Sequence, residues 1–279
     1  MWTIARPETT SLDAFDTCIA GITTADLKQR MQNARGDIEA AEAAFDNAAA
    51  TSSLHLIAST DHVGLVTAKE MERLYDRHMA RGGSRGREIY DKLMIVAEND
   101  TCPFCGHRTV STLDHSLPKV AHPAFAVTPI NLIPCCKDCN HAKGTQSPAT
   151  EEAQLLHAYY DDVTADRWLY AEIVEGSPPA ARFYVETPDD WADMIAARVE
   201  NHFTKLGLAK LYASQAGRHF QNIRRALGEI YDGAGVDAVR EDLERRARSC
   251  ADAIVNSWEG ALYEGAAASN WYCDGGFRA

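Results

Sequence analysis

The sequence predicts an α+β protein that is mostly helical, in which a short cysteine-rich finger lies between helical flanks and precedes a β-hairpin. Three observations predict this fold class. Long segments carry apolar residues at helical spacing, five of the eight cysteines fall within residues 102–139, and two strand-like runs flank a loop containing Gly and Pro. We expect an N-terminal helical region (1–97), the finger (98–150), and a C-terminal hairpin and helical region (151–279).

The N-terminal region is expected to contain three helices. Residues 24–50 are rich in Ala, Glu, Asp and Gln and contain no Pro, which favours a helix with Thr24 as its N-cap. A second helix is expected over residues 67–81 and a third over 87–98. The Gly-rich basic segment 82–86 predicts a flexible loop between them.

The C-terminal region combines strands and helices. Residues 168–174 and 182–185 predict two strands joined by a longer loop. Helical periodicity then returns over the segments 191–203, 211–231 and 236–263. The tail, residues 271–277, is aromatic yet rich in Gly, and we expect it to be held by another element or by a partner.

The charge balance argues against an indiscriminate DNA-binding protein. The net charge is −12, whereas proteins that bind nucleic acid are usually basic on the binding face. A local basic groove remains compatible with an acidic total. Basic residues are concentrated in the segment 73–92, which contains Arg73, Arg77, Arg81, Arg85, Arg87 and Lys92.

The ends and the hydropathy of the chain indicate a cytoplasmic protein without membrane contact. The first residues, 1–7, have no cationic patch followed by an apolar run, and no stretch approaches the ~18 apolar residues that span a bilayer. In such a compartment, paired cysteines indicate metal binding rather than disulfides.

Two CxxC pairs define the finger. Cys102 and Cys105 form the first pair, and Cys136 and Cys139 form the second. Four thiolates in tetrahedral geometry favour Zn²⁺ with no open coordination position, so this ion is expected to be structural. Cys135 adjoins the second pair, but only Cys136 has CxxC spacing to Cys139, so Cys136 is assigned as the ligand.

A second set of residues between and after the cysteine pairs has different chemistry. Asp114 offers a hard oxygen ligand of the kind that Mg²⁺ or Mn²⁺ prefers. His115 can accept a proton near neutral pH. Asn131 is a neutral hydrogen-bonding residue, and Asn140 offers a carbonyl oxygen at the start of the next expected helix.

Together these residues resemble the HNH, or ββα-metal, endonuclease family. The shared features are the Asp114-His115 pair followed by Pro118, the middle asparagine, and Asn140 after the last zinc cysteine with Lys143 three positions later. The pattern CxxC…DH…N…CxxCN is typical of the zinc-bearing subtype. In this family a two-stranded hairpin and a helix surround one divalent ion, and the helical flanks of this chain carry no such resemblance.

The resemblance implies an endonuclease that hydrolyses DNA phosphodiester bonds and leaves 5′-phosphate and 3′-hydroxyl ends. Asp114 and Asn140 would hold Mg²⁺ or Mn²⁺ (Ni²⁺ in some members), and His115 would act as general base on the attacking water. Asn131 would orient His115 through hydrogen bonds within its loop. The lysines near the phosphate would be Lys143 and Lys119.

Two assignments stay open. His141 is the alternative to Asn140 as metal ligand, but adjacent helical residues point about 100° apart, and Asn140 has the better register with the flanking pattern. Arg85 and Arg87 either contact backbone phosphates or belong to a solvated linker.

Three functional alternatives also stay open. The substrate could be RNA, or the chain could be a zinc-stabilised nucleic-acid-binding subunit without catalysis. By analogy with bacterial anti-phage systems, in which such a nuclease is often paired with an ATPase, the helical flanks suggest an effector regulated by an ATPase or another regulatory subunit.

Overall fold

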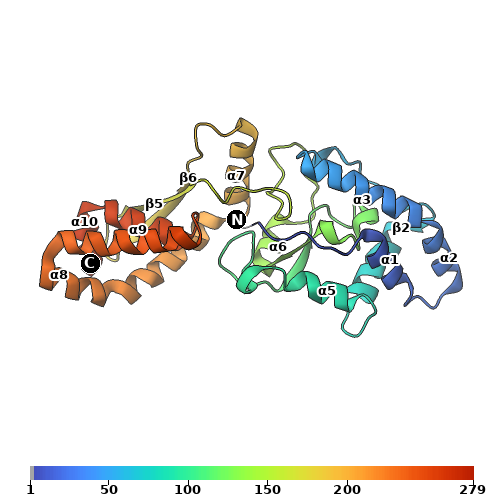
Figure 1. Ribbon diagram of the computed structural model, residues 1–279, viewed down its shortest axis with the longest axis horizontal. Coiled ribbons are helices and arrows are strands. Elements are labelled where there is room, and N and C mark those ends of the chain that lie inside the picture. Colours follow the sequence, from blue (N-terminus) through green and yellow to red (C-terminus); the bar gives the residue numbers. More distant parts are fainter. Residues whose placement is uncertain (1–2) are drawn as a thin grey trace. The chain divides into compact units, whose positions relative to one another are not determined.

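The computed structural model describes residues 3–279 and divides into two compact units between Asp162 and Val163. Each unit is described by itself (Figure 1). The expected boundary between residues 97 and 98 does not separate two compact units, because the finger contributes side chains to the core of the N-terminal helices.

The first unit opens with three helices, α1 (Ser11–Ile19), α2 (Ala25–Asn33) and α3 (Arg35–Ala50). Helix α1 was not among the helices expected from the sequence; its N-cap Thr10 accepts a hydrogen bond from the backbone N–H of Asp13. The single helix expected over residues 24–50 is wrong, because Ala34 (φ −84°, ψ 0°) ends α2 and precedes α3. The break lets both helices bury one face in a shared core.

The next helices follow a short hairpin, β1 (His62–Val63) and β2 (Val66–Thr67). Helix α4 (Ala68–Leu74) begins at Thr67, which forms a capping box with Glu70, and it continues as a π-helical segment, Tyr75–Met79. Helix α5 (Arg87–Met94) ends four residues earlier than predicted. Short 3₁₀ turns occur at Leu54–Leu56, Glu98–Asp100, Pro123–Phe125, Pro129–Asn131 and Gly276–Arg278.

The finger has the element order strand, strand, helix. Strands β3 (Thr112–His115) and β4 (Leu132–Cys135) pair antiparallel, with His115 opposite Leu132, and helix α6 (Lys137–Lys143) follows. Leu132 is fully buried in the core that also contains side chains of α1, α3 and α4. The N-terminal helices therefore support the hairpin directly.

The second unit begins with the predicted hairpin. Strands β5 (Leu169–Val174) and β6 (Ala180–Val185) pair antiparallel along their whole length. The helices that follow, coloured from gold (α7) to red (α10) in Figure 1, are α7 (Asp193–Lys205), α8 (Leu208–Ala253), α9 (Trp258–Ala268) and α10 (Asn270–Cys273).

Two expectations for the second unit are wrong. Helix α8 passes through the predicted gap with a kink at Gly235 (φ +82°), and the helix expected over 236–263 is interrupted where Ser257 caps α9. The aromatic tail is held by another element of its own unit, which is one of the two possibilities expected for it. Tyr272 is buried against Phe220, with ring centroids 5.1 Å apart.

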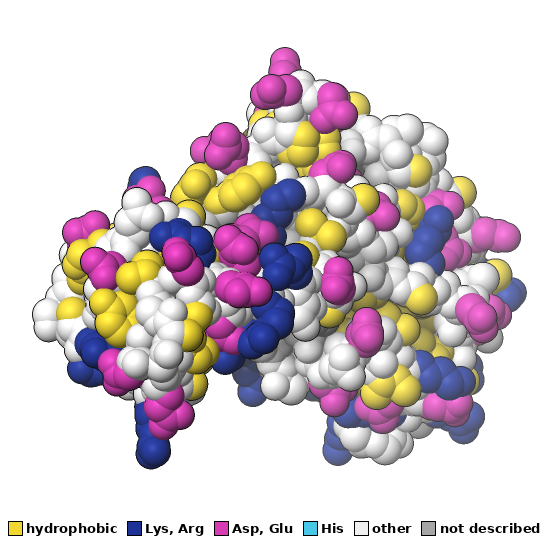
Figure 2. Space-filling view, turned by 60° about the vertical axis from the view of Figure 1, so that its left-hand side comes forward, with side chains coloured by type: hydrophobic (Ala, Val, Ile, Leu, Met, Phe, Trp, Pro, Cys, Tyr) yellow, Lys and Arg dark blue, Asp and Glu magenta, His cyan; other side chains and the backbone are white. Residues whose placement is uncertain are grey.

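Charged side chains of both signs are spread over the surface. Figure 2 shows acidic and basic groups interspersed on one face, in keeping with many ion pairs on a chain of net charge −12. None of the helices between residues 3 and 279 combines the length and hydropathy needed to cross a bilayer.

Candidate functional site

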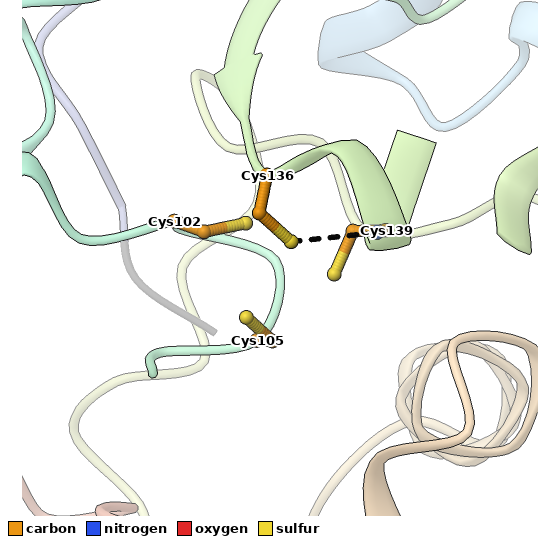
Figure 3. Close-up of side chains that lie close together, drawn as sticks. All are labelled: Cys102, Cys105, Cys136 and Cys139. Carbon is orange, nitrogen blue, oxygen red and sulfur yellow. Dashed lines mark hydrogen bonds between the residues drawn. The ribbon is translucent and has the colours of Figure 1, made fainter. Parts of the chain in front are cut away.

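Four cysteines converge in the finger. The sulfur atoms of Cys102, Cys105, Cys136 and Cys139 all lie within 4.8 Å of one another, and all four side chains are buried (Figure 3). Tetrahedral Zn²⁺ with Zn–S bonds of ~2.3 Å places its sulfur ligands roughly 3.8 Å apart. The cluster therefore fits a zinc ion, as the CxxC spacing predicts.

The first cysteine pair is a tight turn ahead of β3. Gly106 takes a left-handed conformation (φ +57°) and donates a backbone hydrogen bond to the carbonyl of Cys102 (2.8 Å). The backbone N–H of Arg108 donates to the sulfur of Cys105 (3.4 Å). These bonds hold both sulfurs on the inside of the turn.

The second pair lies at the start of α6. Cys136 is the N-cap, and its sulfur accepts a hydrogen bond from the backbone of Cys139 (3.4 Å). An ion pair between Arg108 and Asp138 (2.9 Å) links the two turns. Cys135 is fully buried on β4 and lies outside the four-sulfur cluster, consistent with the choice of Cys136.

Asp114 lies on β3 with its carboxylate nearly buried. Its Oδ2 atom accepts no hydrogen bond, although the Nζ atom of Lys143 lies 3.3 Å away. Lys143 also donates to the carbonyl of His115 (2.7 Å). Burial raises the pKa of Asp114 to about 6, an effect that the charge of Lys143 opposes. Lys143 is therefore the charge partner of this carboxylate, while its Oδ2 atom accepts no hydrogen bond.

His115 follows Asp114 and is held by the backbone. Its Nε2 atom lies 2.9 Å from the carbonyl oxygen of Ala126. Because a carbonyl only accepts, Nε2 carries the proton and Nδ1 keeps its lone pair. Burial of the ring, together with the charges of Lys119 and Lys143, lowers the pKa of His115 to about 3, so the ring is neutral at pH 7.

Asn131 is fully buried and closes the loop between the two strands. Its side chain accepts from the backbone N–H of Leu117 (2.7 Å) and donates to the carbonyls of Leu117 (3.0 Å) and Phe125 (3.1 Å). These bonds hold the loop whose next carbonyl, at Ala126, binds His115. Asn131 thus holds the backbone of the loop in place, and through the loop it positions the Ala126 carbonyl that binds the imidazole of His115.

Helix α6 presents one face to β3. Lys143 contacts Asp114 across this face, and Asn140, three residues earlier, lies on the same side and is half-buried. His141 is exposed. This geometry favours Asn140 over His141 beside Asp114, while its role as a metal ligand stays a prediction.

The structure engages three of the four basic residues expected near phosphate, and one of them, Lys143, pairs with Asp114 as described above. Lys119 pairs with Asp76 (2.6 Å), and Arg87 pairs with Asp91 (2.8 Å). Arg85 is exposed and has no ion-pair partner within residues 3–279. Among these four residues, Arg85 is therefore the one whose charge no acidic side chain neutralises.

One neighbour of His115 was missed by the sequence analysis. The Tyr75 ring meets the imidazole edge-on, with centroids 4.5 Å apart. Lys119 lies over the same Tyr75 ring, with its Nζ atom 4.3 Å from the centroid. Tyr75 lies on the π-helical segment, 40 positions before His115, and no local sequence signal connects the two.

Comparisons with known proteins found partial similarities. The chain is 38% identical over 165 residues to protein ea31 of Escherichia phage lambda, covering 58% of this chain and 55% of that protein. It is 32% identical over 88 residues to the Septu protein PtuB of Bacillus thuringiensis, covering 29% of this chain and 34% of that protein.

The chain thus spans about half the length of the first relative and about a third of the second. No family model and no solved structure matches it. Together with the four-cysteine cluster, these relatives are compatible with an HNH-type nuclease associated with phages or with defence.

Proposed function

We propose that the chain is a metal-dependent endonuclease of the HNH type that hydrolyses DNA phosphodiester bonds. One observation carries the proposal. The strand–strand–helix unit of β3, β4 and α6, joined at its base by the cysteine cluster, brings Asp114, His115 and Lys143 together around a nearly buried carboxylate.

The chain would have two metal sites, one structural and one catalytic. The cysteine cluster offers four sulfur ligands and no open position, so its zinc ion would be structural. Asp114, with Asn140, would hold Mg²⁺ or Mn²⁺, an ion that neutralises charge on the scissile phosphate and stabilises the leaving 3′-oxygen.

The side chains of the chain would perform the remaining steps. His115 would take a proton from the attacking water at Nδ1, because Nε2 is bound to the Ala126 carbonyl. Asn131 would keep that carbonyl in place through its bonds to the loop. Lys143 would supply positive charge to the phosphate beside Asp114.

Two further candidates share this geometry. The contacts of Asp114 and His115 are equally suited to an RNA phosphodiester. A zinc-stabilised nucleic-acid-binding subunit without catalysis is favoured by one contact, the pairing of Lys143 with Asp114, because an ammonium group already neutralises the carboxylate that the ion would need.

A regulatory partner is part of the proposal. The similarity to a phage protein and to a Septu protein supports a role associated with phages or with defence against them. We expect an ATPase or another regulatory subunit to copurify with the full chain in stoichiometric amounts. A lone chain that is active without any partner would contradict this part of the proposal.

The nuclease proposal is tested by incubating the zinc-loaded protein with supercoiled plasmid, linear DNA and RNA, each with Mg²⁺, with Mn²⁺ or without either. We expect DNA cleavage only with the divalent ion, abolished by His115→Ala and retained by His141→Ala, which changes an exposed histidine of α6. Cleavage by His115→Ala at the wild-type rate would refute the assignment of the base. Cleavage of RNA without cleavage of DNA would favour an RNA-cleaving nuclease over the proposed DNA-cleaving one.

A further inference from the structure

A pocket in the first unit lies apart from the cysteine cluster and the Asp114 centre. Its volume is about 450 Å³, and it opens between the turn that connects α1 to α2 and the outer side of α4 with its π-helical extension. This volume falls in the range of sites that bind small molecules or segments of a larger ligand.

Three arginines line one wall of this pocket. Arg73 lies on α4, Arg77 lies on its π-helical extension, and Arg81 follows two residues after the end of that extension; all three line the pocket. All three are exposed, and none has an ion-pair partner within residues 3–279. The pocket thus concentrates three positive charges that the protein leaves unneutralised.

Two acidic residues near this wall, Glu70 and Asp76, are already engaged. Glu70, the acid that lines the pocket, accepts two hydrogen bonds from Arg30, at 2.8 and 2.9 Å. Asp76 is bound by Lys119. On a chain of net charge −12, a pocket wall with uncompensated arginines therefore stands out as a local positive potential.

The opposite wall offers hydrogen-bond donors. Thr23 and Thr24 line it, and Thr24 is the N-cap of α2, whose side chain makes no capping hydrogen bond. The first backbone N–H groups of a helix and an uncommitted hydroxyl are common ligands for anions. His78 also lines the pocket, and its pKa lies below the ordinary value because of burial and the nearby charge of Arg77.

We propose that this pocket, hereafter the arginine pocket, binds phosphate groups through Arg73, Arg77 and Arg81. A guanidinium group binds a phosphate through two parallel hydrogen bonds, so three such groups on one wall can engage several phosphates. Such phosphates come either from a nucleic-acid strand or from a free nucleotide. The site does not depend on the proposed nuclease activity.

The test compares two triple variants of the full-length, zinc-loaded protein. R73Q/R77Q/R81Q removes the pocket charges. R225Q/R245Q/R248Q removes three exposed arginines of α8, each of which has an acidic partner. Because both variants lose three arginines, they change the net charge by the same amount. Both variants are checked for zinc content and circular dichroism, and binding is measured in buffer without Mg²⁺ to a fluorescein-labelled 20-nucleotide DNA and to ADP.

We expect wild type to bind at least one probe, the pocket variant to bind it at least tenfold more weakly, and the α8 variant to stay within twofold of wild type. If DNA is the ligand, the slope of log K against log salt falls in magnitude by about 2–3 in the pocket variant. If ADP is the ligand, the pocket variant loses binding of ADP while its binding of DNA stays unchanged.

Three results would overturn the proposal: wild type binds neither probe, the pocket variant binds both like wild type, or both variants lose affinity equally. A wild type that binds in the pocket yet cuts nothing would instead refute the nuclease proposal.

Discussion

The Nζ atom of Lys143 lies 3.3 Å from Oδ2 of Asp114, and the two side chains are only 11% and 4% exposed. An ammonium group therefore occupies the space beside the carboxylate that we assign to a divalent ion. Breaking a buried ion pair leaves an uncompensated charge, which typically costs about 3–5 kcal/mol.

Lys143→Met is expected to lower the free energy of unfolding by a few kcal/mol in buffer without added Mn²⁺. Added Mn²⁺ should restore much of this stability, because the ion replaces the lost positive charge beside Asp114. Urea denaturation with and without Mn²⁺ measures both effects. Lys137→Met, at an exposed position of the same helix, is the control. Equal stability of both variants would contradict the role of this contact.

Cys136→Ala and Cys135→Ala should behave differently although the residues are adjacent and both buried. The first removes one of the four converging sulfurs, so zinc should be lost and the finger should unfold. The second should keep one zinc ion per chain and cost only about 1–2 kcal/mol through the small cavity it leaves. Zinc analysis by mass spectrometry separates the two; zinc-replete Cys136→Ala protein would refute the ligand assignment.

The two asparagines of the finger should also differ. Asn131→Ala removes three buried hydrogen bonds to the loop and is expected to lower the free energy of unfolding by about 3 kcal/mol or more. Asn140→Ala, at a half-buried position of α6, should change stability little but weaken Mn²⁺ binding. Denaturation and Mn²⁺ titration of both variants test this contrast, which fails if Asn131→Ala is as stable as wild type.

Stability should depend on pH through the pair of Arg30 and Glu70. Hydrogen bonds from Arg30 lower the pKa of Glu70 from 4.5 to about 2. Because the folded pKa lies below the unfolded one, the stabilisation is present above pH 4.5 and is lost as the pH falls towards 2.

Glu70→Gln should therefore destabilise the protein at pH 7 and differ progressively less from wild type at lower pH. Glu88→Gln, which removes one partner of an exposed helical pair with Lys92, is the control and should have little effect at any pH. Urea denaturation across this pH range provides the measurement. A constant difference between Glu70→Gln and wild type would contradict the linkage.

Structural features that are determined by residues close together in the chain were predictable from the sequence. The CxxC spacing of Cys102 and Cys105 fixes two sulfurs on one turn, and Thr67 followed by Glu70 specifies the start of α4. Strand periodicity predicted the hairpin of β5 and β6. In each case neighbouring residues alone determine the geometry.

Features that depend on the packing of distant segments were not predictable. Helix α1 and the break at Ala34 follow from burial in a shared core. Asp242, which the tertiary structure buries, pairs with both Arg245 and Arg246. The contact of Tyr75 with His115 joins elements far apart in the chain.

The central claim is that one finger holds two ions with separate functions, and binding of Mn²⁺ measured by electron paramagnetic resonance tests it most directly. We predict that the wild-type protein binds one Mn²⁺ in addition to one zinc ion. Asp114→Asn should keep the zinc ion and bind Mn²⁺ at least tenfold more weakly. Wild-type protein that contains no zinc, or that binds Mn²⁺ no better than Asp114→Asn does, would contradict the account.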